Sequence, residues 1–195
     1  ECWLRQNNQW IPVPIDVDNE DLNGIWGVGQ GTDIEMVAVG DAGFVTDWVA
    51  GSWSTEDLGT PNFESVAGSS RTDLLAVGWG GVYRSSVDGW TYEAIEGNPR
   101  LNHIWYNGSQ AVGVGDEGTI AVYTPTGWTV YQDSSRKRLY GITSTPNGEL
   151  IAVGEEGTVL HGVGGVWEAR DAGTDVSLWA VEAYDAYNVI AVGNN

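Results

Sequence analysis

Acidic side chains recur in this sequence directly after short apolar stretches that end in glycine. The residue after the glycine is acidic in three places and a tryptophan in a fourth, and a second acid follows in two of them. Carboxylates bind cations and basic groups, whereas an exposed indole stacks on sugar rings or anchors a protein contact. The candidate ligand-binding residues are therefore Trp79, Asp41, Asp116, Glu117, Glu155 and Glu156.

A second acidic cluster lies near the beginning of the sequence. Asp16, Asp18, Glu20 and Asp21 offer closely spaced oxygen ligands of the type that calcium prefers. The cluster lacks the glycine and the bidentate glutamate of an EF-hand loop, so a solvated acidic loop is the competing interpretation. Calcium is the one cofactor that the sequence suggests, and otherwise we expect none.

The elements that position these residues are repeats. The apolar stretch occurs five times, and its final glycines are spaced by 38, 37, 39 and 39 residues. A tryptophan after a turn follows about a dozen residues later, and another short apolar stretch precedes each one. Short alternating segments separated by glycine-rich turns indicate strands. The five stretches are Val37-Ala38-Val39-Gly40, Leu75-Ala76-Val77-Gly78, Val112-Gly113-Val114-Gly115, Ile151-Ala152-Val153-Gly154 and Ile190-Ala191-Val192-Gly193.

Each repeat predicts a sheet of four short antiparallel strands. Such a sheet is apolar on both faces, so it can bury them only by packing against the sheets of neighbouring repeats. The fifth unit, residues 178–195, stops after two strands, and residues 1–21 supply a strand, a turn and Trp10. We therefore predict an all-β, five-bladed β-propeller of one domain, 1–195, whose last blade is closed by the N- and C-terminal halves. The blades are expected at about 22–62, 63–100, 101–138, 139–177, and 178–195 with 1–21. We expect the turn glycines to supply positive φ, and Trp10, Trp53, Trp90, Trp128 and Trp167 to be buried between blades.

Two sequence patterns resemble known propeller families. Ser85-Ser86-Val87-Asp88-Gly89-Trp90-Thr91 resembles the Asp-box of BNR-repeat propellers, a structural turn in those proteins. The repeated outline, with Val-Ala-Val-Gly, an acid, Gly-Thr and a later Gly-x-Trp, is similar to YCF48-like photosystem-assembly propellers and to propeller repeats of secreted bacterial proteins. The resemblance covers the whole chain and implies the fold. The other turns lack the Asp-box aspartate, and known YCF48-type members have more blades.

The charge limits the partners. The chain has 195 residues and a net charge of −19, and nucleic acid binding requires a basic surface. No apolar run is long enough to cross a bilayer. We therefore expect no nucleic acid, no membrane insertion, a monomeric state and an extracellular or periplasmic location.

The expected function is recognition without catalysis, as a recognition or scaffold module that binds carbohydrate or protein through the loops of one propeller face. The inner strands carry Glu64 and Glu182 but no aspartate at matched positions. A glycosidase-like hydrolase with a central funnel site, which needs converging carboxylates, is the first alternative. An engineered or excised propeller without a ligand of its own is the second.

Overall fold

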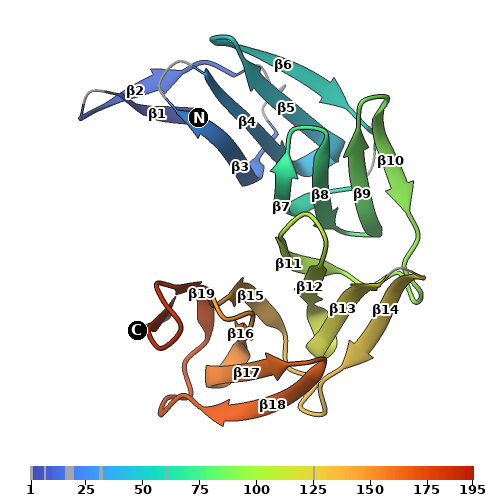
Figure 1. Ribbon diagram of the computed structural model, residues 1–195, viewed down its shortest axis with the longest axis vertical. Coiled ribbons are helices and arrows are strands. Elements are labelled where there is room, and N and C mark those ends of the chain that lie inside the picture. The colour runs from blue at the N-terminus through green and yellow to red at the C-terminus, as the bar shows by residue number, and fades with distance from the viewer. Residues whose placement is uncertain (1, 7, 16–19, 31–32, 60, 125) are drawn as a thin grey trace.

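The chain folds as an all-β protein in a computed structural model that describes residues 2–6, 8–15, 20–30, 33–59, 61–124 and 126–195. Four complete antiparallel sheets follow one another along the chain, each with its strands in sequence order (Figure 1). Blade 1 comprises β3 (Leu22–Gln30), β4 (Asp33–Gly40), β5 (Phe44–Val49) and β6 (Ser52–Asp57). Blade 2 comprises β7 (Phe63–Ser70), β8 (Asp73–Gly78), β9 (Gly81–Ser86) and β10 (Gly89–Glu93). Blade 3 comprises β11 (Leu101–Tyr106), β12 (Ala111–Gly115), β13 (Thr119–Thr124) and β14 (Gly127–Gln132). Blade 4 comprises β15 (Leu139–Ser144), β16 (Leu150–Gly154), β17 (Thr158–Val163) and β18 (Val166–Asp171).

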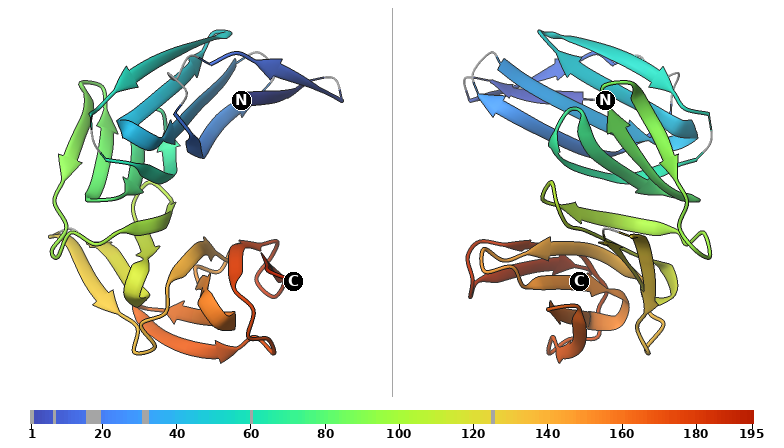
Figure 2. Two further views of the ribbon diagram at one scale, coloured as in Figure 1. Left: turned by 180° about the vertical axis from the view of Figure 1, so that it is seen from behind. Right: turned by 45° about the vertical axis from the view of Figure 1, so that its right-hand side comes forward.

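Two further strand pairs lie at the ends of this series. β1 (Cys2–Gln6) pairs with β2 (Gln9–Val13), and β19 (Leu178–Ala183) pairs with β20 (Val189–Gly193). Both are separate two-stranded sheets, so the described strands do not show the expected last blade, in which the N-terminal half (residues 2–6) would pair with the C-terminal half (residues 189–193). The physical reason is the gentle turn from each blade to the next, which leaves the repeats in an open arc (Figures 1 and 2). Ring closure and the fivefold blade count are not confirmed.

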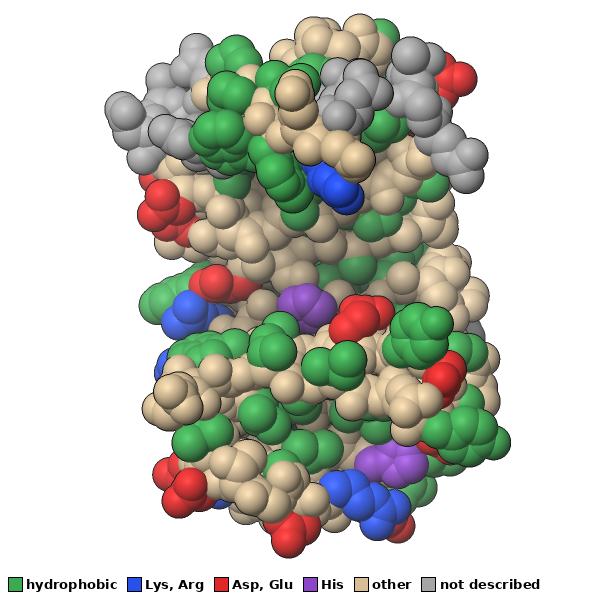
Figure 3. All heavy atoms as spheres, turned by 90° about the vertical axis from the view of Figure 1, so that its left-hand side faces the viewer, with side chains coloured by type: hydrophobic (Ala, Val, Ile, Leu, Met, Phe, Trp, Pro, Cys, Tyr) green, Lys and Arg blue, Asp and Glu red, His purple; other side chains and the backbone are tan. Residues whose placement is uncertain are grey.

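The core lies between successive blades, because each blade presents apolar side chains on both faces. Val37 and Val39 of β4 pack with Phe63 and Val66 of β7, and all four are at most 7% exposed. The corresponding residues of the next blades repeat this contact. At the ends of the arc the equivalent residues are exposed, Ile25 at 60% and Ile190 at 66%. Figure 3 looks into the open side, where hydrophobic side chains are visible on both arms.

The repeated tryptophans pack toward the preceding blade. Trp90, Trp128 and Trp167 are partly buried against the clusters that join blades 1 and 2, 2 and 3, and 3 and 4. Trp53 is also partly buried and packs edge-on against Trp48, with ring centroids 5.3 Å apart. Trp10 differs, since its side chain is 65% exposed at one end of the arc. Four of the five tryptophans are therefore partly buried, three of them between blades as expected, and Trp10 is exposed.

The glycine that ends each apolar stretch is needed for a reason other than the predicted one. Gly115 has φ −163°, which is extended backbone that any residue adopts. A Cβ at this position would overlap the carbonyl oxygen of Arg100, which precedes the inner strand of the same blade. The predicted positive φ is found at the glycine that ends the turn, Gly118 (67°), and also at Glu117 (55°) before it. The first glycine is thus required by close backbone approach.

The helical elements of the described chain are three 3-10 turns, η1 (Asp41–Gly43), η2 (Asp116–Gly118) and η3 (Glu155–Gly157). None is long and apolar enough to cross a membrane.

Candidate functional site

One end of the blades carries a row of recurring positions along the arc that we call the rim. In every repeat the residue after the recurring glycine donates its backbone N–H to the carbonyl of the residue that precedes the inner strand. The bond joins Asp116 to Arg100 at 3.1 Å and Trp79 to Asn62 at 3.0 Å, and it recurs in the other three repeats. We call this bond the rim latch. It fixes the backbone of both rim loops and leaves their side chains free to differ.

The rim side chains are also paired, in combinations that change from repeat to repeat. The side chain of the residue after the glycine forms a hydrogen bond with the side chain of the second residue of the inner strand. The two partners are an amide and a carboxylate in the first and third repeats, a carboxylate and an indole in the second, a phenol and a carboxylate in the fourth, and an indole and an amide in the fifth. The five pairs are Asn23–Asp41, Glu64–Trp79, Asn102–Asp116, Tyr140–Glu155 and Trp179–Asn194, with donor–acceptor distances of 2.8, 3.2, 3.0, 3.3 and 2.7 Å. The backbone is therefore repeated here while the chemistry is not.

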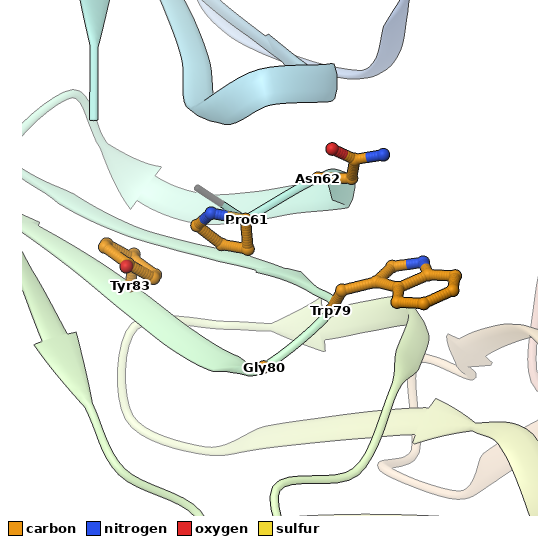
Figure 4. Close-up of a pocket in the computed structure, with 5 residues that line it drawn as sticks. All are labelled: Pro61, Asn62, Trp79, Gly80 and Tyr83. Atoms are coloured by element: carbon orange, nitrogen blue, oxygen red, sulfur yellow. The ribbon is translucent and has the colours of Figure 1, made fainter. Parts of the chain in front are cut away.

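Blade 2 has a shorter rim turn than the other complete blades. Gly78 pairs directly with Gly81 across a two-residue turn formed by Trp79 and Gly80, where blades 1, 3 and 4 have three-residue 3-10 turns. Gly80 and Gly81 have positive φ, 98° and 128°, which this tight turn requires. The shorter turn lies beside a cavity of about 440 Å³ lined by Pro61, Asn62, Trp79, Gly80 and Tyr83. Figure 4 shows Tyr83 and Trp79 at opposite ends of this cavity, with Pro61 between them.

Trp79 is exposed and yet held in place. Its side chain is 54% exposed. Its indole Nε1 donates to Glu64 Oε1 at 3.2 Å, and the guanidinium of Arg100 lies over the ring at 4.5 Å from the centroid. Arg100 also donates to the same Glu64 oxygen at 2.6 Å, so the three side chains form one closed cluster across blades 2 and 3. One face of the indole is thus covered by a cation, and much of the ring remains open to a ligand.

The acidic candidates face cations of the chain itself. Arg138 Nε lies 2.7 Å from Asp116 Oδ1, Arg136 lies 3.6 Å from Glu117, and Lys137 lies 2.9 Å from Glu156. The acidic rim of blades 3 and 4 is thereby largely neutralised by residues 136–138. Asp41 is held by the Asn23 amide instead.

Tyr140 extends the rim toward β19. Its ring packs against Trp179 with centroids 4.2 Å apart, and its hydroxyl donates to Glu155. Burial, and after it the Glu155 carboxylate, raise the pKa of the Tyr140 hydroxyl. The rim therefore has aromatic side chains at two places, Trp79 on blade 2 and the Tyr140–Trp179 pair.

The predicted calcium cluster is only partly described. Asp16 and Asp18 lie outside the described residues. Asp21 uses its backbone carbonyl in the rim latch with Asp41. Within the described ranges no group of three or more His, Cys, Asp or Glu side chains is arranged to hold a metal ion. Calcium binding stays a prediction.

The two inner-strand carboxylates of the hydrolase alternative lie on different regions of the arc. Glu64 on β7 is bound to Arg100 and Trp79, and Glu182 is on β19. Glu64 therefore acts as the acceptor of the Trp79 cluster in this structure.

Sequence reasoning missed Arg100, Glu64 and Tyr140 as rim residues. All three sit at fixed repeat positions: Arg100 directly before an inner strand, and Glu64 and Tyr140 second within one. Aligning the repeats on the inner strands rather than on the glycine turns brings these positions together, and the residue type at both positions changes from repeat to repeat.

Comparisons with known proteins support the fold. No protein-family model matches the chain, and no curated protein matches its sequence. Similar solved structures include YCF48 bound to D1 peptide (TM-score 0.70, 17% identity) and the WD40 β-propeller domain of Doa1 (TM-score 0.72, 12% identity). YCF48 from Cyanidioschyzon merolae is similar too, with a TM-score of 0.62 and 20% identity.

These matches cover 96, 90 and 87% of this chain but 66, 63 and 62% of those proteins. The chain thus spans less than two thirds of the length of each of these structures. At such identities the likeness establishes the fold. The chain is a β-propeller repeat protein that resembles YCF48.

Proposed function

We propose that this chain is a protein-binding propeller module that holds a peptide segment on its rim, with Trp79 as the anchoring side chain. The observation that carries the proposal is an exposed indole, fixed on two sides, next to a cavity of about 440 Å³. The other residues of the cavity wall, Pro61 and Tyr83, supply further apolar surface for a peptide side chain.

The contacts that hold the Trp79 side chain in place support a binding role for this residue. A free surface tryptophan loses side-chain entropy when a ligand orders it, whereas the contacts with Glu64 and Arg100 order Trp79 beforehand. Tryptophan and arginine are among the residue types most enriched at the energetic centres of protein interfaces. The cluster therefore has the composition and the rigidity of an interface centre.

The similar solved structures and the net charge of the chain indicate the class of ligand. One of the similar structures is a propeller bound to a peptide, which supports a peptide as the ligand class here. With a net charge of −19, the chain repels acidic segments and attracts basic ones through long-range electrostatics. We therefore propose a peptide segment with a positive net charge that places an apolar or cationic side chain on the open face of the Trp79 ring.

The test is a binding screen with fluorescent peptides of matched length that are basic, neutral or acidic, followed by anisotropy titrations with Trp79→Ala. Tyr131→Ala is the matched control, because Tyr131 is 51% exposed and lies on the outer strand β14. Loss of an anchoring residue costs about 2 kcal/mol or more, which is roughly 30-fold in Kd. We expect that loss for Trp79→Ala and an unchanged Kd for Tyr131→Ala.

Two results would contradict the proposal. One is that no peptide of any charge binds at concentrations up to the millimolar range. The other is that Trp79→Ala binds the selected peptide as tightly as the unaltered chain while its circular dichroism shows an intact sheet.

We further propose that the module does not hydrolyse glycosides. Acid and base catalysts require environments that differ from each other, and Glu64 is committed to an ion pair with Arg100 at 2.6 Å. We expect no turnover of common aryl-glycosides. Turnover that disappears in Glu64→Gln or Glu182→Gln would instead support the hydrolase alternative.

A further inference from the structure

A second pocket lies on the face opposite the rim, between blades 3 and 4. Its volume is about 190 Å³. It is bordered by the ends of β11 and β13, the β15–β16 turn and the β17–β18 hairpin. Three of its lining residues are aromatic, Trp105, Tyr123 and Trp167. None of its lining residues among the described stretches of the chain is charged.

The pocket is associated with a glycine at one repeat position. In each complete blade the tryptophan at the second position of the outer strand faces a residue of the third strand. That residue is Trp48 in blade 1, Ser85 in blade 2 and Tyr123 in blade 3, and in blade 4 it is Gly162. Tyr123 fills the space beside its partner Trp128, with ring centroids 5.3 Å apart. At Gly162 there is no side chain to do so, and Trp167 lies so close that an added Cβ would be 2.9 Å from its ring.

The second aromatic wall also differs from its counterpart. Trp105 occupies the same inner-strand position as Trp26. The Trp26 indole donates to the Gly68 carbonyl of the next blade at 2.9 Å. Among the described residues Trp105 has no such partner for its Nε1, and Gln110 and the backbone of Gly148, Gly164 and Gly165 line the pocket near it. Within the described part of the chain, blade 3 thus presents an indole N–H without a hydrogen-bond acceptor, whereas the equivalent indole of blade 1 is bonded to the next blade.

We propose that this pocket binds one pyranose ring of a neutral carbohydrate. Aromatic side chains stack on the apolar C–H face of a sugar ring, and Tyr and Trp also bring a polar group to such contacts. Gln110, the free indole N–H and the glycine backbone offer donors and acceptors to hydroxyl groups. The absence of charged residues from the described lining favours a neutral ligand. At roughly 30 Å³ for each water in the liquid, the volume corresponds to about six waters, which suits a single ring.

This site is independent of the rim. It lies at the other end of the blades, and none of the described lining residues is shared by the two cavities. Carbohydrate binding here therefore neither requires nor excludes a peptide on Trp79.

The test is a titration of the 195-residue chain with glucose, galactose, mannose and N-acetylglucosamine, followed by saturation-transfer NMR and intrinsic tryptophan fluorescence. Gly162→Tyr introduces the side chain that blade 3 carries at this position and should fill the pocket. We expect at least about tenfold weaker binding for Gly162→Tyr and no change for Trp79→Ala. Trp26→Phe, at the equivalent position of blade 1, is the control for altering an inner-strand tryptophan and should bind like the unaltered chain.

A second variant keeps the test decisive if the tyrosine disturbs packing against Trp167. Trp105→Leu removes one stacking wall without adding volume and should also weaken binding at least about tenfold. The proposal is overturned if none of the four sugars gives a saturable signal at millimolar concentration. It is equally overturned if folded Gly162→Tyr and Trp105→Leu bind a sugar as well as the unaltered chain.

Discussion

Acidification should weaken the junction between blades 3 and 4 through a single histidine. His103, on the inner strand β11, accepts a hydrogen bond at its Nδ1 from the backbone N–H of Ile142 on β15, at 3.4 Å. Ser65 has the equivalent role in the preceding blade, where its Oγ accepts from the backbone N–H of Ile104. The imidazole must be neutral at Nδ1 to accept this bond, and burial of the ring lowers the pKa of His103 below its usual 6.5.

The direction of the effect follows from proton linkage. Well above pH 6.5, as at pH 7.5, the ring is almost entirely neutral in both the folded and the unfolded chain, and nearly the full stability is present. As the pH falls further, the unfolded chain takes up a proton that the folded chain resists. The free energy of unfolding then decreases with falling pH until the folded state is protonated as well.

The magnitude has an upper bound. If the folded ring stayed neutral, lowering the pH from 7.5 to 5.5 would cost at most about 1.4 kcal/mol, which is the protonation free energy of a group with a pKa near 6.5. For a domain of this length each kcal/mol shifts the Tm by roughly 2–4 °C. The His103 contribution to the Tm difference is therefore up to about 3–6 °C.

The assay compares thermal melts of the unaltered chain and His103→Gln at pH 7.5 and 5.5. A glutamine amide can accept the Ile142 hydrogen bond and does not titrate. His161, which lies 3.1 Å from Glu149, is unchanged in both proteins, so its contribution cancels in the difference. We expect a smaller Tm decrease for His103→Gln. Equal Tm decreases for the two proteins would refute the reasoning.

Three further predictions concern stability and are measured by chemical denaturation. Gly115→Ala should cost about 2 kcal/mol or more because the new Cβ overlaps a backbone carbonyl. Gly113→Ala is the control and should be nearly neutral. Its Cβ meets only the tip of a leucine side chain, and alanine is the residue found at this position in the other four repeats. Ser85→Ala should cost about 1–3 kcal/mol because the hydroxyl accepts from a buried backbone N–H at 2.8 Å, and a smaller loss would indicate that water replaces it. Trp128→Phe should cost about 1.5–3 kcal/mol because its Nε1 donates to the Glu93 carboxylate at 2.8 Å across the blade boundary, and the loss should shrink in a Glu93→Gln background.

The sequence was sufficient to predict the blades because their strands and turns are local. The spacing of the glycine stretches indicated the four-strand units and the strand order, and each complete sheet confirms them. Ring closure was not predictable in the same way. It depends on the angle between neighbouring blades. The packing of residues such as Val39 against Phe63 sets that angle, and the length of a repeat does not indicate it.

The site was only partly predictable, for a similar reason. Trp79 was found because it breaks a repeat, and the structure places it, exposed, beside the blade 2 cavity. Its partners lie on other elements, Glu64 on β7 and Arg100 directly before β11, so the residues next to Trp79 in the sequence do not indicate the cluster. The ion pairs between residues 136–138 and the acidic turns were not predicted for the same reason. The three basic residues are adjacent to one another in the sequence, but they are distant in the sequence from the acidic turns that they contact.

The rim latch has a consequence for how such a protein changes over evolution. Its bond joins two backbone groups, and the glycine beside it removes the one Cβ that would obstruct it. The residue after that glycine can therefore be replaced with little penalty to folding, and in this chain it is an aspartate twice, a tryptophan, a glutamate and an asparagine. Mutational robustness and chemical diversity thus coincide at the same positions of the rim. A library randomised there should retain the fold while sampling new binding specificities.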